Sequence, residues 1–172
     1  MTSAPTFTPS PTPTATTEPL PLVLNGDFEQ GRNGDWAEAS SNGAPIILGG
    51  GLPISARSGH YVAWLGGLDD EISVLSQTFL LAGASEPLYL KFYYQIRSSD
   101  GCRYDFAEVR FDSFVIWEAD LCSSEETNDW IGVSLNLSYF LGADMKLEFI
   151  VTTDYSVPSS FFIDDVTITR SP

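Results

Sequence analysis

The sequence has little of what most hydrolytic enzymes use for catalysis. It contains one histidine, His60, and two cysteines, Cys102 and Cys122. A Ser-His-Asp arrangement needs a histidine as its base. His60 stands at the start of an expected strand, where we interpret it as an exposed residue at the rim of a sheet. Carboxylate pairs abound in an acidic chain, but no spacing singles out one suited to cleaving a glycosidic bond. These absences predict a protein that is not an enzyme.

Positive charge is also scarce. The chain has 8 Lys and Arg residues against 23 Asp and Glu residues, which gives a formal net charge of −15. A surface this acidic repels nucleic acid and anionic lipid, so we expect no nucleic-acid partner. No apolar run approaches the roughly 20 residues that span a bilayer, so we expect no membrane insertion. The charge suits cations and neutral ligands such as sugars.

Proline and threonine dominate residues 1–21, which read MTSAPTFTPSPTPTATTEPLP. Proline fixes φ and removes backbone donors, and this segment has almost nothing apolar to bury. We expect a disordered, semi-rigid linker of the kind that joins the modules of secreted proteins. A frayed terminus is the alternative. The composition changes abruptly at Leu22, so we expect one domain over residues 22–172.

After Leu22, short β-branched and aromatic runs are separated by Gly, Asn, Asp, Ser and Pro, which is typical of an all-β sandwich or barrel. The expected strands are Ala44–Leu48, His60–Leu65, Ser73–Leu80, Leu88–Arg97, Phe106–Phe111, Ser113–Glu118, Trp130–Leu135, Met145–Thr152 and Phe161–Thr169. Ser138–Gly142 is the one helix-like stretch, and we expect a single turn there. Alternation along Leu88–Arg97 and Met145–Thr152 predicts one face on the core and one toward solvent.

Several motifs together resemble a known family. LVLNGDFEQG, followed by Trp36, is similar to the first strand of jelly-roll carbohydrate-binding modules. SARSGHYVAWLGG, ISVLSQTFLL, LYLKFYYQIRSSD, YDFAEVRFD and the closing VTTDYSVPSSFFIDDVTI resemble MAM-like jelly rolls appended to bacterial secreted peptidases and glycosidases. The resemblance covers Leu22 to Ile168. It implies a two-sheet antiparallel β-sandwich of galactose-binding-like topology, usually non-catalytic and often with structural calcium, but it does not define the ligand.

The calcium site follows from this resemblance. In the resembling modules, acidic residues of the first and last strand motifs meet at one edge, and these correspond to Glu29 and Asp165. Asp27 and Asp164 are their neighbours, and the Ala56–Gly59 loop would add carbonyls. Ca²⁺ takes six to eight oxygen ligands, and adjacent aspartates in an apolar strand need a cation or donors. We therefore expect calcium, with solvated or hydrogen-bonded edge residues as the alternative.

The two cysteines flank two expected strands. If Phe106–Phe111 and Ser113–Glu118 form a hairpin with its tip near Asp112–Ser113, Cys102 and Cys122 face each other at its open end. That arrangement permits a disulfide, which would contribute about 3 kcal/mol in an exported protein. Free thiols are the alternative in a reducing compartment.

One strand carries aromatic and polar residues on the face away from the core. These are Tyr89, Tyr93, Gln95 and Arg97, and we expect a sugar to lie across them with Tyr93 as the stacking ring. Trp117 is expected to face outward as well. Trp36, Trp64 and Trp130 stand at regular strand positions, where large aromatics more often belong to the core.

Together these features predict a non-catalytic, extracellular or cell-surface binding module. Its expected partner is carbohydrate, with structural calcium as the cofactor. A protein-adhesion or spacer domain that binds another extracellular protein is the alternative, and we expect a monomer.

Overall fold

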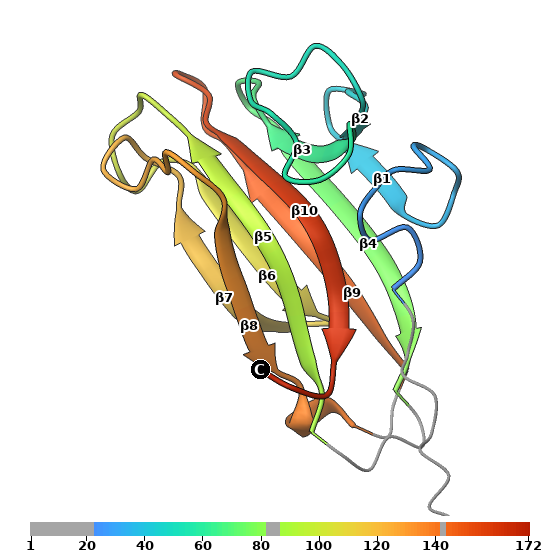
Figure 1. Cartoon of the computed structure of the whole chain (residues 1–172). Helices are drawn as coiled ribbons and strands as arrows, with labels where there is room; N and C mark the ends of the chain where they lie inside the picture. The colour runs from blue at the N-terminus through green and yellow to red at the C-terminus, as the bar shows by residue number, and fades with distance from the viewer. Residues whose placement is uncertain (1–22, 82–86, 142–143) are drawn as a thin grey trace, which may run out of the picture.

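The computed structural model describes residues 23–81, 87–141 and 144–172 of the chain. In these residues two antiparallel five-stranded sheets form a β-sandwich, which confirms the predicted fold class (Figure 1). The first sheet has the order β1-β4-β9-β6-β7 and the second has the order β2-β3-β10-β5-β8. The predicted linker, residues 1–21, lies outside the described residues, so that boundary stays a prediction.

The described strands match the expected ones closely. They are β1 (Ala37–Ser40), β2 (Ile47–Leu48), β3 (Val62–Gly66), β4 (Ile72–Leu80), β5 (Tyr89–Arg97), β6 (Phe106–Phe111), β7 (Phe114–Asp120), β8 (Ile131–Asn136), β9 (Asp144–Thr152) and β10 (Ser160–Thr169). The single turn expected after β8 is the 3-10 helix η1 (Ser138–Phe140). Only β1 was not predicted, because its sequence AEAS lacks the β-branched and aromatic residues that mark a strand.

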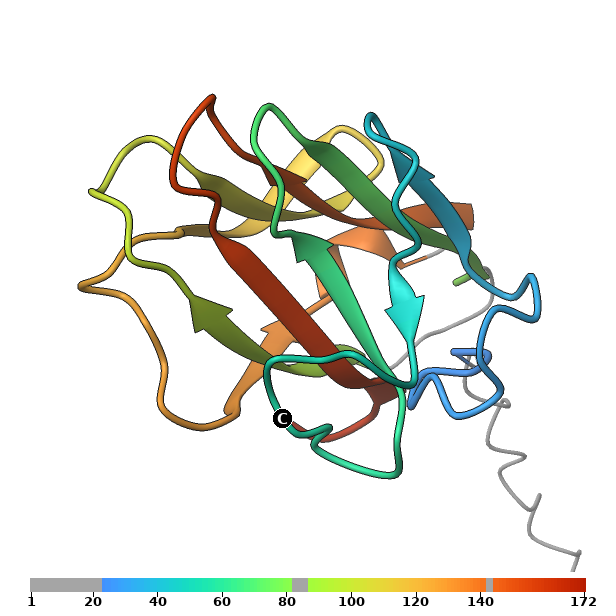
Figure 2. The same ribbon diagram turned by 90° about the horizontal axis from the view of Figure 1, so that it is seen from above.

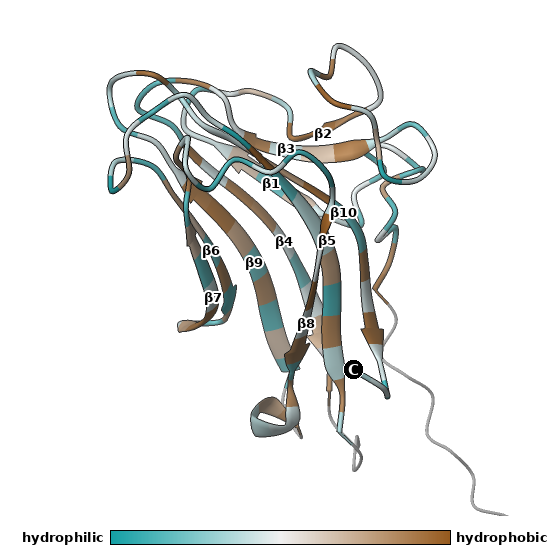
Figure 3. Ribbon diagram, turned by 60° about the vertical axis from the view of Figure 1, so that its left-hand side comes forward, coloured by the Kyte–Doolittle hydropathy of each residue, from teal (hydrophilic) through white to brown (hydrophobic). Residues whose placement is uncertain are grey.

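The core lies between the two sheets, which Figure 2 shows as two layers. Alternate residues of β9 are fully or almost fully buried, and the residues between them are more exposed, so only one face of this strand contacts the core. On β5 the inward residues Leu90, Phe92 and Ile96 are buried, as the alternation predicted. Figure 3 shows the same alternation as bands of opposite hydropathy along the strands.

Strand β10 differs because its first half is buried on both faces. All residues from Ser160 to Asp164 are buried. Phe161 and Ile163 belong to the main core, whereas Phe162 is 0% exposed but packs against Trp64 on the outer face. Hydrogen bonds from the β2–β3 connection to Asp164 hold that connection against β10. The second sheet therefore has a covered outer face.

The two ends of the sandwich carry different features. Tyr89 pairs with Asn136 and with Thr169, so the start of β5 lies at the same end as the finish of β8 and β10. Helix η1 and the C-terminus lie at this end (Figure 1). Arg97 and Trp130 lie at the opposite end, together with the disulfide. Among the described residues, no helix has the length and apolarity needed to cross a membrane.

Candidate functional site

A cavity lies on the outer face of β5, toward the end that carries the disulfide. Its volume is about 640 Å³, within the range of small-molecule sites. The floor is formed by Tyr93, Gln95 and Arg97, three of the residues that the sequence predicted for ligand binding. The β2–β3 connection and the segment before β8 form its walls, with the lining residues Ile54, Ser55, Ala56, Arg57, Asn128, Asp129 and Trp130.

Tyr93 is not an open stacking surface. The guanidinium carbon of Arg57 lies 3.4 Å from the centroid of the Tyr93 ring. Gly132 lies beside the same ring, since a Cβ added there would approach a ring carbon to 3.0 Å. Arg57 also pairs with Asp165. Arg57 therefore stacks on the ring that was predicted to stack on a sugar, although Tyr93 lines the cavity.

Gln95 and Arg97 supply the polar groups of the floor. Gln95 is 5% exposed, and its Oε1 has no hydrogen-bond partner among the described residues. An unpaired buried carbonyl oxygen is costly and favours a bound donor. Arg97 donates from Nη1 to the carbonyl oxygen of Thr127 at 2.6 Å and pairs with Glu126 at 3.4 Å. These contacts fix Arg97 beside the cavity.

Trp130 was expected in the core but lies at the cavity. It is half-buried at the wall of the cavity, whereas its position in an expected strand favoured the core. Its Nε1 donates to the carbonyl oxygen of Ser55 at 3.3 Å, which links the two walls. The signal in the sequence was its place directly after Asn128-Asp129, since a ring just after a polar loop often lies at a strand end rather than in the core.

Two predicted ligand residues lie elsewhere. Tyr89 shares the outer face of β5 but stands at the other end of the strand and does not line the cavity. Trp117 was expected to face outward, and this is wrong. A register shift puts Trp117 opposite Val109 and Val115 opposite Arg110, which leaves Ile116 as an extra residue on β7. The bulge reverses the alternation, so Trp117 packs against Phe92, Tyr94 and Phe161 between the sheets.

The four residues predicted to bind calcium already accept hydrogen bonds from other groups of the chain. Oε1 of Glu29 accepts from the backbone amides of His60 and Tyr61, at 2.8 and 2.7 Å. Asp165 accepts from the Ser58 hydroxyl and pairs with Arg57. Exposed Asp27 accepts from the Glu29 amide at 3.3 Å. N–H groups, a hydroxyl and a guanidinium thus occupy oxygens that were predicted to bind calcium, and calcium at these four residues stays a prediction.

Asp164 makes the most contacts of this acidic set. Its side chain is 0% exposed, and Oδ2 accepts from the amides of Arg57 at 2.9 Å and Ser58 at 3.2 Å. Oδ1 accepts from the Asp165 amide at 2.7 Å. Burial raises the pKa of Asp164 to about 7, although the amide donors act in the opposite direction. Asp164 holds the β2–β3 connection.

An acidic cluster compatible with a metal lies instead between the β5–β6 and β9–β10 loops. One carboxylate oxygen each from Asp100, Asp105 and Asp154 lies within 4.8 Å of the other two. Oδ2 of Asp100 is buried and has no partner among the described residues. Asp105 is fully buried and accepts from the amides of Asp154 and Ser159, both at 2.8 Å.

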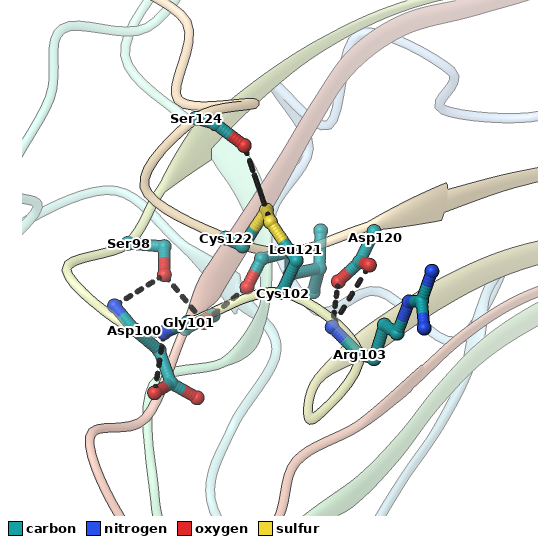
Figure 4. The surroundings of a disulfide bond; sticks show 10 residues. Ser98, Asp100, Gly101, Cys102, Arg103, Asp120, Leu121, Cys122 and Ser124 are labelled. Carbon is teal, nitrogen blue, oxygen red and sulfur yellow. Dashed lines mark hydrogen bonds between the residues drawn. A yellow bond between two sulfur atoms is a disulfide. The ribbon is translucent and has the colours of Figure 1, made fainter.

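The expected disulfide joins Cys102 to Cys122 beside this cluster, with Cα atoms 4.9 Å apart (Figure 4). The tip of the β6–β7 hairpin is at Asp112, as predicted, and the cysteines close its other end. Both oxygens of Asp120 accept from the Arg103 amide at 2.9 Å, which fixes the loop next to the bond. The bond ties the β5–β6 loop to the residues that follow β7.

Solved structures with this architecture include several sugar-binding proteins. A family 61 carbohydrate-binding module in complex with β-1,4-galactotriose aligns with a TM-score of 0.63 and 18% identity, over 89% of this chain and all of that one. A cleaved K3 adhesin domain of Lys-gingipain from Porphyromonas gingivalis aligns at 0.58 and 16%, over 86% and 96%. The chain has the fold of a carbohydrate-binding module. No protein-family model and no curated protein matches the sequence.

The same fold also occurs in enzymes. The Stig cyclase Fisc from Fischerella sp. TAU aligns with a TM-score of 0.55 and 14% identity, over 89% of this chain and 98% of the cyclase. Identities this low establish the architecture and leave the ligand and the activity to be argued from the site.

Proposed function

We propose that the protein is a non-catalytic, extracellular carbohydrate-binding module whose site is the cavity on β5. The observation that carries this proposal is a cavity lined by half-buried Trp130 and by Gln95, whose buried Oε1 has no partner among the described residues. A sugar ring offers C–H groups for an indole face and hydroxyl donors for a carbonyl oxygen. Trp130 replaces Tyr93 as the stacking residue.

The charges around the cavity favour a neutral sugar. Arg57 is neutralised by Asp165, and Arg97 by Glu126. Asp129 adds a carboxylate to the wall. The whole chain has a net charge of −15, which opposes the approach of an anionic glycan. A neutral oligosaccharide meets no such repulsion.

Calcium enters the proposal at Asp100, Asp105 and Asp154 rather than at Glu29 and Asp165. The supporting observation is the buried, unpartnered Oδ2 of Asp100 within this set of carboxylates. Calcium at a hundredfold excess over its Kd would stabilise the protein by about 2.7 kcal/mol. Asp100→Asn should remove that increment in thermal unfolding, whereas Glu29→Gln should keep it. A wild-type melting curve that chelator leaves unchanged would contradict the calcium proposal.

Protein adhesion is the second candidate, favoured by exposed aromatic rings at the other end of the sandwich. Phe114 is 51% exposed and Tyr139 is 83% exposed, and both contact Phe140. Exposed apolar surface of this kind is common at protein interfaces. This end lies far from the cavity on β5, so substitutions can be chosen that affect one of the two functions and not the other.

A glycan array screened with monomeric protein tests the main proposal. We expect binding to neutral oligosaccharides, retained in chelator because the cavity contains no proposed metal ligand. Trp130→Ala should reduce the array signal, and Tyr139→Ala should not. A folded wild type that binds no glycan would leave adhesion as the function of this domain.

A further inference from the structure

Two carboxylates bind four backbone amides of one short segment. Asp164 accepts from Arg57 and Ser58, and Glu29 accepts from His60 and Tyr61. All four N–O distances lie between 2.7 and 3.2 Å. Charge-assisted bonds of this kind are stronger than those between neutral groups. Residues 57–61 are thus held at nearly every amide.

Gly59, the residue between these two pairs of amides, fits the same arrangement. It has a φ of +56°, a conformation that residues with a Cβ rarely adopt. A Cβ at this position would lie 2.1 Å from the carboxylate carbon of Glu29. The backbone therefore approaches the carboxylate so closely that no side chain fits between them.

The held segment continues directly into the wall of the cavity. Residues 54–57 line the cavity, so Arg57 belongs to both the wall and the held segment. Its side chain pairs with Asp165 and covers Tyr93, and Ser55 accepts from Trp130. A displacement of residues 57–61 would therefore move Arg57, which covers Tyr93, and Ser55, which accepts from Trp130.

We infer that Glu29, Asp164 and Asp165 are positioning residues that hold the cavity wall through N–H donors and the Arg57 ion pair, without a metal ion. The expected consequence for sugar binding rests on the proposed function, whereas the way in which the wall is held does not. The donors already point at the carboxylate oxygens, and Arg57 places a positive charge beside Asp165. These N–H donors and the guanidinium of Arg57 thus supply the positive charge that a bound cation would otherwise place beside the carboxylates.

Amide hydrogen exchange tests this inference without any ligand. In the full chain at about pH 8, where Asp164 is ionised, Asp164→Asn should speed exchange at residues 57–61 about tenfold or more, because amides lose their bonds to a charged acceptor. Gly59→Ala should speed exchange at the same amides while keeping both carboxylates. The exposed Asp144→Asn removes the same charge and should change nothing there. EDTA should leave wild-type exchange at residues 57–61 unchanged.

Two results would overturn the inference. One is wild-type exchange at residues 57–61 that rises in EDTA to the level of Asp164→Asn, because a metal would then hold the segment. The other is an Asp164→Asn variant with unchanged exchange at these amides.

A binding arm with β-1,4-galactotriose as probe separates this inference from the proposed function. We expect Asp164→Asn to weaken galactotriose binding at least fivefold, at a temperature where near-ultraviolet circular dichroism shows the variant fully folded. Unchanged affinity with faster exchange would show that the wall does not position the ligand. A wild type that binds neither galactotriose nor any arrayed glycan would refute the proposed function, and the exchange results would still decide how the segment is held.

Discussion

Strands β9 and β10 lie at equivalent central positions, one in each sheet, but their outer faces differ. On β9 the outward side chains include Lys146 and Glu148, which form an ion pair at 2.6 Å in contact with solvent. On β10 the outward side chains Phe162 and Asp164 are 0% exposed. Asp164 is covered because it accepts from Arg57 and Ser58, and Phe162 is covered because it packs against Trp64. The cavity lies beside the covered face.

The comparison shows that a sandwich can carry two kinds of outer surface. An open face needs only solvated side chains, and its sequence alternates cleanly. A covered face must satisfy buried polar groups, which here are Asp164 and the amides of Arg57 and Ser58. This polar construction fixes loops in place, and fixed loops form a preorganised binding site.

The largest expected effect is the difference in stability loss between two phenylalanine-to-alanine variants, one on each of these faces. Phe162→Ala should lower the free energy of unfolding by about 3–5 kcal/mol, since it leaves a cavity beside Trp64. Phe106, on β6 of the open sheet, is 43% exposed, and Phe106→Ala should cost about 1 kcal/mol or less. Urea unfolding of both variants measures this, and equal losses would show that the two faces are equivalent.

Removing the disulfide that closes the β6–β7 hairpin should have a somewhat smaller effect on stability. The bond joins residues separated by 20 positions, so replacing both cysteines with serine should cost about 3 kcal/mol. The double variant should keep its fold, because the cysteines lie outside the strands. Thermal unfolding of the variant beside oxidised wild type gives the difference, and an unchanged melting temperature would contradict the stabilising role.

Asp164 should give the covered face a pH dependence. Its pKa is raised by burial from 3.8 to about 7, so the folded state binds more protons than the unfolded state between these values. Its contribution to stability is therefore complete below about pH 4 and is lost as the pH rises through about 7. Between pH 5 and 6.5, the free energy of unfolding of wild type should fall by at most about 2 kcal/mol relative to that of Asp164→Asn.

Urea unfolding across that pH range measures the difference, with Asp144→Asn as the matched control. The control should follow wild type at every pH, since Asp144 is exposed. A difference between wild type and Asp164→Asn that is constant from pH 5 to 6.5 would show that Asp164 keeps an ordinary carboxyl pKa.

The smallest effect belongs to the open face. Lys146→Ala breaks the pair with Glu148, and solvent-exposed pairs contribute about 0–1 kcal/mol. The loss should shrink further in high salt. A loss above about 2 kcal/mol in urea unfolding would mean that this face is as constrained as the covered one.

The sequence predicted the fold well because period-two alternation is a local property. It placed β5 and β9 correctly, and the spacing of Cys102 and Cys122 about a hairpin predicted their pairing. It also gathered Tyr93, Gln95 and Arg97 on one face. These successes depend only on residues that are neighbours within a strand or a hairpin.

The remaining errors concern contacts between distant segments. The bulge that turns Trp117 inward depends on register with β6, which alternation along β7 does not reveal. The stacking of Arg57 on Tyr93 joins residues of two different elements. The donors to Glu29 and Asp164 come from a loop whose path the sequence does not specify, so the resemblance to calcium-binding modules was the only available guide.

The most direct test of the account is nuclear magnetic resonance titration of labelled protein with a neutral glycan found on the array. We predict the largest shifts at the Trp130 indole N–H, the Gln95 side-chain amide and the backbone of residues 54–57. Signals from Tyr139 and Phe114 should not move. Shifts confined to the aromatic end, with Trp130 and Gln95 unperturbed at saturation, would contradict the assignment of the cavity on β5 as the sugar site.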